Sequence, residues 1–285
     1  MESSTPPAGT AAVTVTTVQD GRISRAADLL ATEVPVALHC NGSPFVVMMA
    51  TPHQLDDFAH GFSVSEGLVD SIDEITACAV RPIEPGRPLA GFEIALQIPP
   101  ARHAALLKRQ RNLLGRSSCG LCGTATIEAA MHSPRPVTSF MTLPTGAIDR
   151  ALAALAHHQP LNQLTGALHG AAWCTITGEI TALHEDVGRH NALDKLIGQR
   201  LRARDDFAAG FALITSRASY EMVQKSASVG IAVLVAVSAP TLAAVELATA
   251  CNITLVGFAR GNRHLIYSHP QRLLASADSG RVAAR

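Results

Sequence analysis

The chain has 285 residues, of which 47% are hydrophobic and 16% are charged, and its 23 basic residues balance 23 acidic ones. That length buries a substantial core in one large domain or two smaller ones. Zero formal net charge and only 4% aromatic residues argue against a nucleic-acid-binding surface and against a face for anionic membranes.

The two most unusual stretches of composition suggest a tail and a buried strand. Residues 1–22 are rich in Ser, Thr, Pro and Ala and lack both a basic start and an apolar run, so we expect a disordered tail and no signal peptide. The most apolar stretch, 229–251, is interrupted by Ser238, Pro240 and Glu246. It is typical of a buried strand followed by a helix, not of a membrane span. We therefore expect a cytoplasmic protein.

Residues 23–115 predict a small α+β domain. Two β-rich runs flank the hairpin signal Asn41-Gly42-Ser43-Pro44, and Thr51 is placed to cap the helix that follows it. The predicted elements are strands 34–40 and 45–49, a helix at 52–67, strands 75–83 and 92–98, and a helix at 102–112.

Residues 145–272 alternate between strand and helix patterns, which predicts a layered α/β/α domain whose sheet is largely parallel at its end. Residues 116–144 are expected to be a cysteine loop and linker, and 273–285 a C-terminal tail. In chain order the predicted elements are helix 146–158, strands 172–177 and 179–185, helix 189–202, strand 211–215, helix 220–230, strand 232–237, helix 242–251, strand 254–258 and a short strand 264–267.

The segment Arg116-Ser117-Ser118-Cys119-Gly120-Leu121-Cys122-Gly123 is the most informative in the chain. Its small residues leave both sulfurs uncovered, and the helical pattern at 124–131 places an N-terminal dipole where it favours a thiolate. Three interpretations stay open: half of a zinc site, a redox pair, or a sulfur carrier that holds a persulfide. The other cysteines (Cys40, Cys78, Cys174 and Cys251) lie in apolar surroundings typical of core packing.

Three further clusters are candidates for chemistry. Residues 184–191 (HEDVGRHN) contain His184, Asp186 and His190, and are compatible with a metal site, an acid/base group, or a helix cap formed by Asp186. His169 stands beside glycine and alanine and is compatible with a core or turn position. Residues 258–263 (FARGNR) end the last long strand, where α/β proteins bind ligands, and their arginines match phosphate oxygens. The alternative there is a solvated turn. Ser216 and Arg217 follow the predicted strand 211–215, and we expect them to line the same ligand-binding crevice at the ends of the strands.

Together these segments resemble the formate dehydrogenase accessory sulfurtransferases, the FdhD family. The resemblance spans about residues 34–272, with the motifs in the expected order. The matching stretches are 61–67 (GFSVSEG), 116–123 (RSSCGLCG), 165–166 with His169, 183–192 (LHEDVGRHNA), 215–217 (TSR) and 257–263 (GFARGNR).

The resemblance implies a sulfurtransferase that receives persulfide sulfur from a cysteine desulfurase. Cys119 would carry the sulfur and Cys122 would support or relay it. The acceptor would be the molybdenum (or tungsten) of a bis-molybdopterin guanine dinucleotide cofactor, bound as substrate, before its insertion into the formate dehydrogenase catalytic subunit. The family also implies a homodimer and a second domain similar to cytidine deaminases. The residues implied to bind the cofactor are Phe258, Ala259, Arg260, Gly261, Asn262 and Arg263.

Deaminase chemistry itself does not match the residues. A zinc deaminase needs an H-x-E motif with a downstream P-C-x-x-C. The nearest analogue is His169-Gly170-Ala171, which lacks the glutamate, and the chain's C-x-x-C lies upstream of it. We therefore expect no resident metal. The two competing hypotheses are a zinc-dependent hydrolase on this fold and a non-catalytic chaperone for the molybdenum cofactor.

Overall fold

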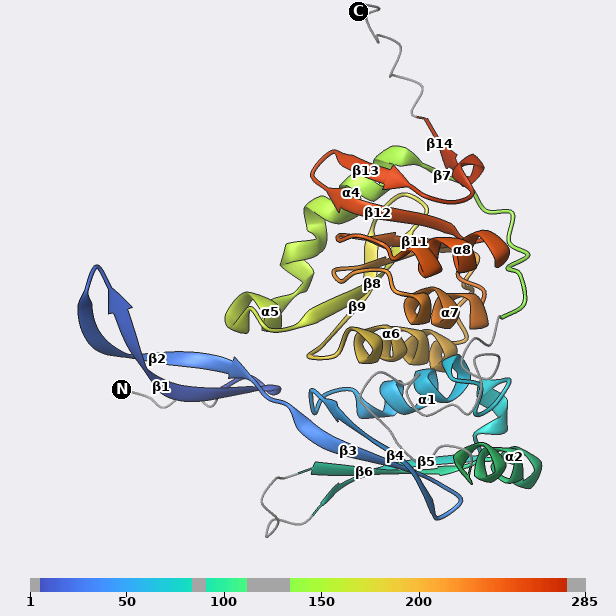
Figure 1. The fold of residues 1–285 in the computed structure, drawn as a ribbon, viewed down its shortest axis with the longest axis horizontal. Helices are drawn as coiled ribbons and strands as arrows, with labels where there is room; N and C mark the ends of the chain where they lie inside the picture. The colour runs from blue at the N-terminus through green and yellow to red at the C-terminus, as the bar shows by residue number, and fades with distance from the viewer. Residues whose placement is uncertain (1–5, 84–90, 112–133, 276–285) are drawn as a thin grey trace, which may run out of the picture.

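The computed structural model describes residues 6–83, 91–111 and 134–275, which form two stacked lobes and a projecting hairpin (Figure 1). The strands are β1 (Thr10–Gln19), β2 (Arg22–Ala31), β3 (Val34–Cys40), β4 (Ser43–Ala50), β5 (Ala77–Ile83), β6 (Gly91–Gln97), β7 (Leu143–Pro144), β8 (His169–Thr175), β9 (Ile180–Asp186), β10 (Gly210–Ile214), β11 (Val233–Ala236), β12 (Thr254–Arg260), β13 (Arg263–Ile266) and β14 (Leu273–Leu274). The α-helices are α1 (Leu55–Ser65), α2 (Pro100–Arg111), α4 (Thr145–Leu155), α5 (Pro160–Thr165), α6 (Arg189–Ala203), α7 (Tyr220–Ser228) and α8 (Leu242–Ala250).

The N-terminal lobe is a four-stranded sheet, in the order β4-β3-β6-β5, with α1 packed on one face. Strand β3 alternates buried and half-buried residues, as a strand with one core-facing side should. Its inward side chains join Phe58 and Phe62 of α1 in one hydrophobic cluster. The predicted strands and helix of this region are confirmed.

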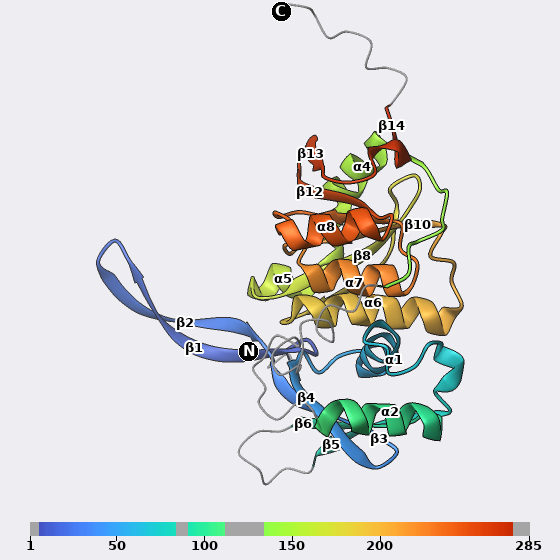
Figure 2. The ribbon, with the colours of Figure 1, turned by 45° about the vertical axis from the view of Figure 1, so that its right-hand side comes forward.

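The C-terminal lobe is a six-stranded sheet in the order β13-β12-β11-β10-β8-β9. Strands β10, β11 and β12 run parallel, and the remaining neighbours are antiparallel. Helices α6, α7 and α8 cover one face and α4 covers the other (Figure 2). Every residue of β10 and β11 is buried because both faces of the sheet are covered. The layered α/β fold predicted for this region is confirmed.

The lobes meet where α1 lies against α6, and two glycines allow the close approach. A Cβ on Gly61 would lie 1.8 Å from the carbonyl oxygen of Asp194, and one on Gly198 would lie 1.8 Å from that of Asp57. No larger side chain fits at either position without moving backbone. The glycine that opens the 61–67 motif is therefore required by helix packing.

A buried ionic cluster joins the same two lobes. The Nζ of Lys225 lies 2.9 Å from Asp194 Oδ2 and 2.6 Å from Glu66 Oε1, and donates to Ser65 Oγ at 3.0 Å. Burial alone would disfavour the Lys225 cation, but these two carboxylates outweigh it and raise its pKa. Ser65 and Glu66 belong to the 61–67 motif, so the motif builds the contact between lobes.

The N-terminal prediction was wrong for residues 10–22. Strands β1 and β2 form a regular antiparallel hairpin that projects from the body (Figure 1). Asp20 and Gly21 make its two-residue turn, both with positive φ, 51° and 76°. An Asp-Gly pair between β-prone runs is a strong hairpin signal, and the polar composition of the segment masked it.

The predicted C-terminal tail also begins too early. Leu273 and Leu274 form β14, which pairs with β7 at Leu143 and Pro144. Arg272, just before β14, donates from Nη2 to the carbonyl oxygen of Ser139 at 3.1 Å. The end of the linker and the start of the tail are thus joined to each other.

Thr51 does not cap α1, contrary to the sequence-based prediction. The helix begins at Leu55, and its N-cap residue is Gln54 with φ of 54°. Thr51 is fully buried, and its backbone N–H donates to Asp186 Oδ2 at 3.1 Å. Its hydroxyl accepts from the Val187 N–H at 3.2 Å, so it serves the contact between lobes instead.

No helix in the described part of the chain is both long enough and apolar enough to cross a membrane.

Candidate functional site

The motifs of the C-terminal lobe converge on one edge of its sheet. Because β10, β11 and β12 are parallel, they all end there: Val237 N–H donates to Ile214 O at 2.9 Å, and Phe258 N–H donates to Ser238 O at 3.1 Å. Strand β8 begins at the same edge and β9 ends there, since His169 pairs with Asp186. We call this set the carboxyl edge; it comprises His169, residues 186–190, 215–221, 237–240 and 258–263.

Three helices begin at the carboxyl edge. Helix α6 follows β9, α7 follows β10 and α8 follows β11, with lengths of 15, 9 and 9 residues. The first N–H groups of each helix have no partner within the helix, and its N-terminus carries a partial positive charge. In α8 the Thr241 hydroxyl accepts one of them, from Ala244. The edge is therefore suited to an anionic ligand such as a phosphate.

The segment from Phe258 to Arg263 departs from regular strand geometry. A register shift lies between Gly257 and Arg260, and Phe258 has φ of 50° with 40% of its surface exposed. A non-glycine residue held in this conformation costs about 1–3 kcal/mol and is typical of binding sites. Ala259 is fully buried and anchors the segment in the sheet.

The two arginines of this segment face solvent. They pair across the β12–β13 hairpin, and Arg260 uses Nε to donate to Val237 O at 3.1 Å. Gly261 and Asn262 form the exposed turn between them, with φ of 57° at Gly261. The result is an exposed pair of guanidinium groups beside an exposed aromatic ring, a combination suited to a nucleotide.

A histidine–glutamate pair joins the starts of two helices at this edge. His190 Nε2 lies 2.7 Å from Glu221 Oε2, which connects the first turns of α6 and α7. His169 is half-buried; burial, and then the nearby guanidinium of Arg189, lower its pKa. Glu221 was not identified from the sequence. The available signal was its position: an acidic residue shortly after a buried strand and Ser216-Arg217.

Asp186 is a structural residue and not the predicted helix cap. The N-cap residue of α6 is Gly188, and Asp186 is fully buried at the end of β9. Its carboxylate lies 2.6 Å from Lys195 Nζ and accepts from Asn191 Nδ2 at 3.0 Å and from the Gly188 N–H at 2.8 Å. These contacts fix the turn that presents Arg189 and His190.

His184 lies away from the edge, between the lobes. It is 2% exposed, with Nδ1 2.6 Å from Gln54 Oε1 and Nε2 2.9 Å from Gln199 Oε1. Burial lowers its pKa. Its position indicates a role in joining the lobes.

The four cysteines within the described residues are packing residues, as predicted. Cys40, Cys174 and Cys251 are buried and Cys78 is half-buried. Burial raises the pKa of Cys40 and Cys78 to about 11 and that of Cys174 to about 12, and it also raises the pKa of Cys251. Thiols of this kind are poor nucleophiles at neutral pH. Cys119 and Cys122 lie outside the described residues.

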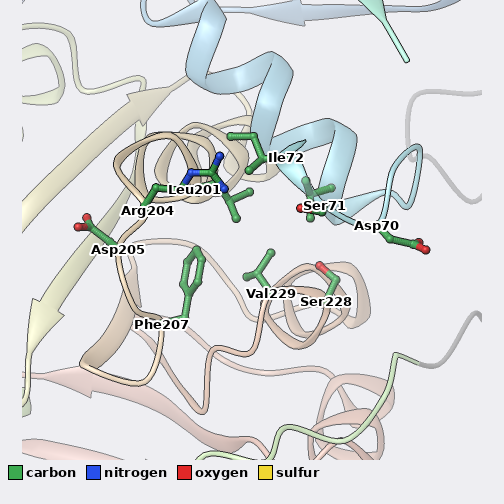
Figure 3. A pocket seen from close by; sticks show the side chains of 10 residues that line it. Asp70, Ser71, Ile72, Leu201, Arg204, Asp205, Phe207, Ser228 and Val229 are labelled. Atoms are coloured by element: carbon green, nitrogen blue, oxygen red, sulfur yellow. The ribbon is translucent and has the colours of Figure 1, made fainter. Parts of the chain in front are cut away.

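A cavity of about 330 Å³ lies between the lobes at the C-terminal end of α6, away from the carboxyl edge (Figure 3). Leu201, Phe207 and Val229 form its apolar wall, and Arg204 at its rim is bonded to Asp73. It contains none of the predicted site residues, so the carboxyl edge remains the candidate site.

Comparison with known proteins agrees with this architecture. Residues 31–274 match the model of the FdhD/NarQ family. The chain is 49% identical over 265 residues to a protein named sulfur carrier protein FdhD from Xanthomonas campestris pv. campestris (strain B100), covering 93% of this chain and 92% of that one. It is 47% identical over 276 residues to the protein of the same name from Xanthomonas oryzae pv. oryzae (strain MAFF 311018), covering 97% and 96%.

The fold is shared with a solved structure. A crystal structure of a protein described as a formate dehydrogenase accessory protein, from Desulfotalea psychrophila, superposes with a TM-score of 0.73 at 24% identity. The match covers 93% of this chain and 99% of that one. The extent of the family match and the identity to the curated relatives lead to one conclusion: the chain belongs to the FdhD/NarQ family.

Proposed function

We propose that this protein accepts sulfur as a persulfide on Cys119 and transfers it to the molybdenum of bis-molybdopterin guanine dinucleotide, which formate dehydrogenase then requires. The observation that carries the proposal is the distribution of thiols: the four described cysteines are packing residues with raised pKa values, which leaves Cys119 and Cys122 for sulfur chemistry. The names of the curated relatives support it.

The carboxyl edge is the proposed binding site for the nucleotide ends of that substrate. Three helix N-termini and the guanidinium groups of Arg260 and Arg263 favour its phosphates. The exposed Phe258 ring offers a face on which a base stacks. Ala259, Gly261 and Asn262 shape the turn that holds these groups in place.

The first step is thiol exchange. The Cys119 thiolate attacks the outer sulfur of the desulfurase persulfide, the sulfur–sulfur bond of that persulfide breaks, and the desulfurase cysteine leaves as a thiolate. In the second step the Cys122 thiol attacks the inner sulfur of the Cys119 persulfide. A Cys119–Cys122 disulfide forms and sulfide is released to the metal. A thiol reductant then restores both cysteines.

The proposal includes two protein partners, a cysteine desulfurase and the formate dehydrogenase catalytic subunit, and a cytoplasmic location. It also includes a homodimer. All four follow from the resemblance to the family and from the substrate chemistry above.

Intact-mass measurement after incubation with a cysteine desulfurase and cysteine tests the proposal. We expect a sulfur-sized mass gain in the wild type that reductant reverses and that Cys119→Ala lacks. Cys122→Ala should gain the sulfur but fail to release it as sulfide. Cys40→Ala is the matched control and should behave as wild type.

Two outcomes would contradict the proposal. If the wild type gained no sulfur, a cofactor chaperone would replace the carrier. If Cys122→Ala released sulfide at the wild-type rate, Cys122 would have no part in the second step.

A further inference from the structure

The β1–β2 hairpin leaves the outer edge of β2 without a neighbouring strand. It is a sheet of two strands, and in the described part of the chain no third strand joins it. All residues from Arg22 to Asp28 are exposed, with Ile23 exposing 76% of its surface. Leu29 is half-buried, and β2 contacts α5 of its own chain. Two strands alone are at best marginally stable in water, so a further strand would stabilise this arm.

The register identifies which backbone groups face outward. Thr32 N–H donates to Gly9 O at 2.8 Å, and the pairing continues without a shift to Gln19 opposite Arg22. Because hydrogen-bonded and non-hydrogen-bonded pairs alternate, even-numbered β2 residues bond to β1. Odd-numbered residues, from Ile23 to Leu29, therefore direct their N–H and C=O groups to the free edge.

We propose that β2 pairs with β2 of a second copy of this chain, antiparallel and about a two-fold axis at Ala26. This register places Ile23 opposite Leu29 of the second copy, so apolar side chains meet. It also places Ser24 opposite Asp28 of the second copy and Arg22 diagonal to that carboxylate. The two smallest side chains, one Ala26 from each copy, meet on the axis.

The sequence of β2 favours this register over its neighbours. A seam centred on Arg25 would place two guanidinium groups directly opposite each other, which is unfavourable. A seam centred on Ala27 would set Arg25 opposite Leu29 and lose the apolar pair. The chosen register also complements charge locally, because Arg22 of one hairpin lies near Asp28 of the other.

The partner is a second copy because the edge is complementary to itself, as a two-fold interface requires. Joining two hairpins gives a four-stranded sheet, which exceeds the size at which sheets become stable. The inference rests on the dimer of the proposed function and specifies its contact surface.

Disulfide trapping tests the register. Ala26 would form a non-hydrogen-bonded pair across the seam, where Cα atoms are about 4.5 Å apart, within the range that a disulfide spans. Ala26→Cys should therefore give a disulfide-linked dimer on mild oxidation, with the linked peptide identified by mass spectrometry. Ala27→Cys is the matched control, because its two copies would be diagonal neighbours about 7–8 Å apart and should link poorly.

A proline variant tests the seam without oxidation. The Ala27 N–H faces the free edge, so Ala27→Pro removes a donor of the seam and leaves the bonds between β1 and β2 intact. Sedimentation velocity should show the dimer dissociation constant rise at least tenfold. The control Thr16→Ala, on β1, should leave it unchanged.

The outcomes separate the two proposals. A dimer that forms no link through Ala26→Cys and is unaffected by Ala27→Pro would overturn this seam and leave the homodimer intact. A wild type that is monomeric at every concentration tested would overturn both. If Ala27→Pro did not fold, the Ala26→Cys trapping result would decide alone.

Discussion

Cations occupy two opposite environments in this protein. Between the lobes, Lys195 and Lys225 are buried and bonded to carboxylates at 2.6–2.9 Å. At the carboxyl edge, Arg260 and Arg263 are exposed, and no carboxylate of the described residues lies within ion-pair distance of them. A buried cation with its partner fixes structure, whereas an exposed cation without one is available to an incoming anion.

The same distinction separates the motifs. Residues 61–67 and the Asp186 carboxylate contribute to the contact between the lobes. Residues 258–263 instead carry polar groups that face outward from a strained strand end. A motif match alone does not distinguish a residue that holds the lobes together from one that binds a ligand. The burial of its side chain does.

The largest expected effect comes from removing a buried cation. Lys225→Met leaves Asp194 and Glu66 without their partner, which should cost about 3–5 kcal/mol of the free energy of unfolding. Arg202→Met is the matched control: Arg202 also bridges the lobes, to Asp57, but its side chain is 47% exposed. That change should cost no more than about 1 kcal/mol. Urea unfolding of both variants measures the difference, and equal losses would contradict the comparison.

An intermediate effect is expected at the carboxyl edge, on binding and not on stability. Arg260→Ala combined with Arg263→Ala should weaken binding of guanosine diphosphate at least tenfold, since bonds to charged groups contribute about 1.5–3 kcal/mol each. The melting temperature should stay within about 1–2 °C of wild type, because both side chains are exposed. Isothermal titration calorimetry tests this, with Arg81→Ala, an exposed position on β5, as control. Unchanged affinity would remove these arginines from the site.

The smallest effect concerns pH. Burial lowers the pKa of His184 below that of the unfolded chain, so between the two pKa values the unfolded state binds more protons. Stability therefore rises with pH in this window and is lost as pH falls below about 6.5, by up to about 1.4 kcal/mol per pH unit for one histidine. Chemical unfolding at pH 7 and pH 5 should show a smaller loss for His184→Gln than for wild type, with the exposed His157→Gln as control. If His184→Gln lost as much stability between pH 7 and pH 5 as the wild type, His184 would not be the source of the pH dependence.

Local patterns predicted most of the fold because helices and strands follow periodicity. The strand pair of the N-terminal lobe and the alternation after residue 145 both appear in the predicted order. Helix α5 was not predicted, and β8 begins at His169 instead of residue 172. Thr51 misled for a physical reason: a Thr-Pro pair is a common helix start, yet its hydroxyl and N–H bond to residues more than 130 positions away. Such long-range partners leave no local signal.

The site was predictable in its parts but not in its assembly. Phe258 to Arg263 was expected to end a strand and does so, but the positive φ of Phe258 has no sequence signature. The contact between His190 and Glu221 joins helices that are adjacent only through the sheet order. A helix cap was one of the roles open to Asp186, but its carboxylate is instead paired with the buried Lys195, nine residues later.

The close fit of α1 to α6 has a consequence for biosynthesis. Helix α1 ends at Ser65, but the helix that covers it is complete only at Ala203. At a synthesis rate of about 5–20 residues per second, the glycine-lined face of α1 waits roughly 7–28 s for its partner. During that interval Phe62 and Glu66 have no cover from the C-terminal lobe. Because α1 stays uncovered for this time, the nascent chain most needs a chaperone before its second half emerges from the ribosome.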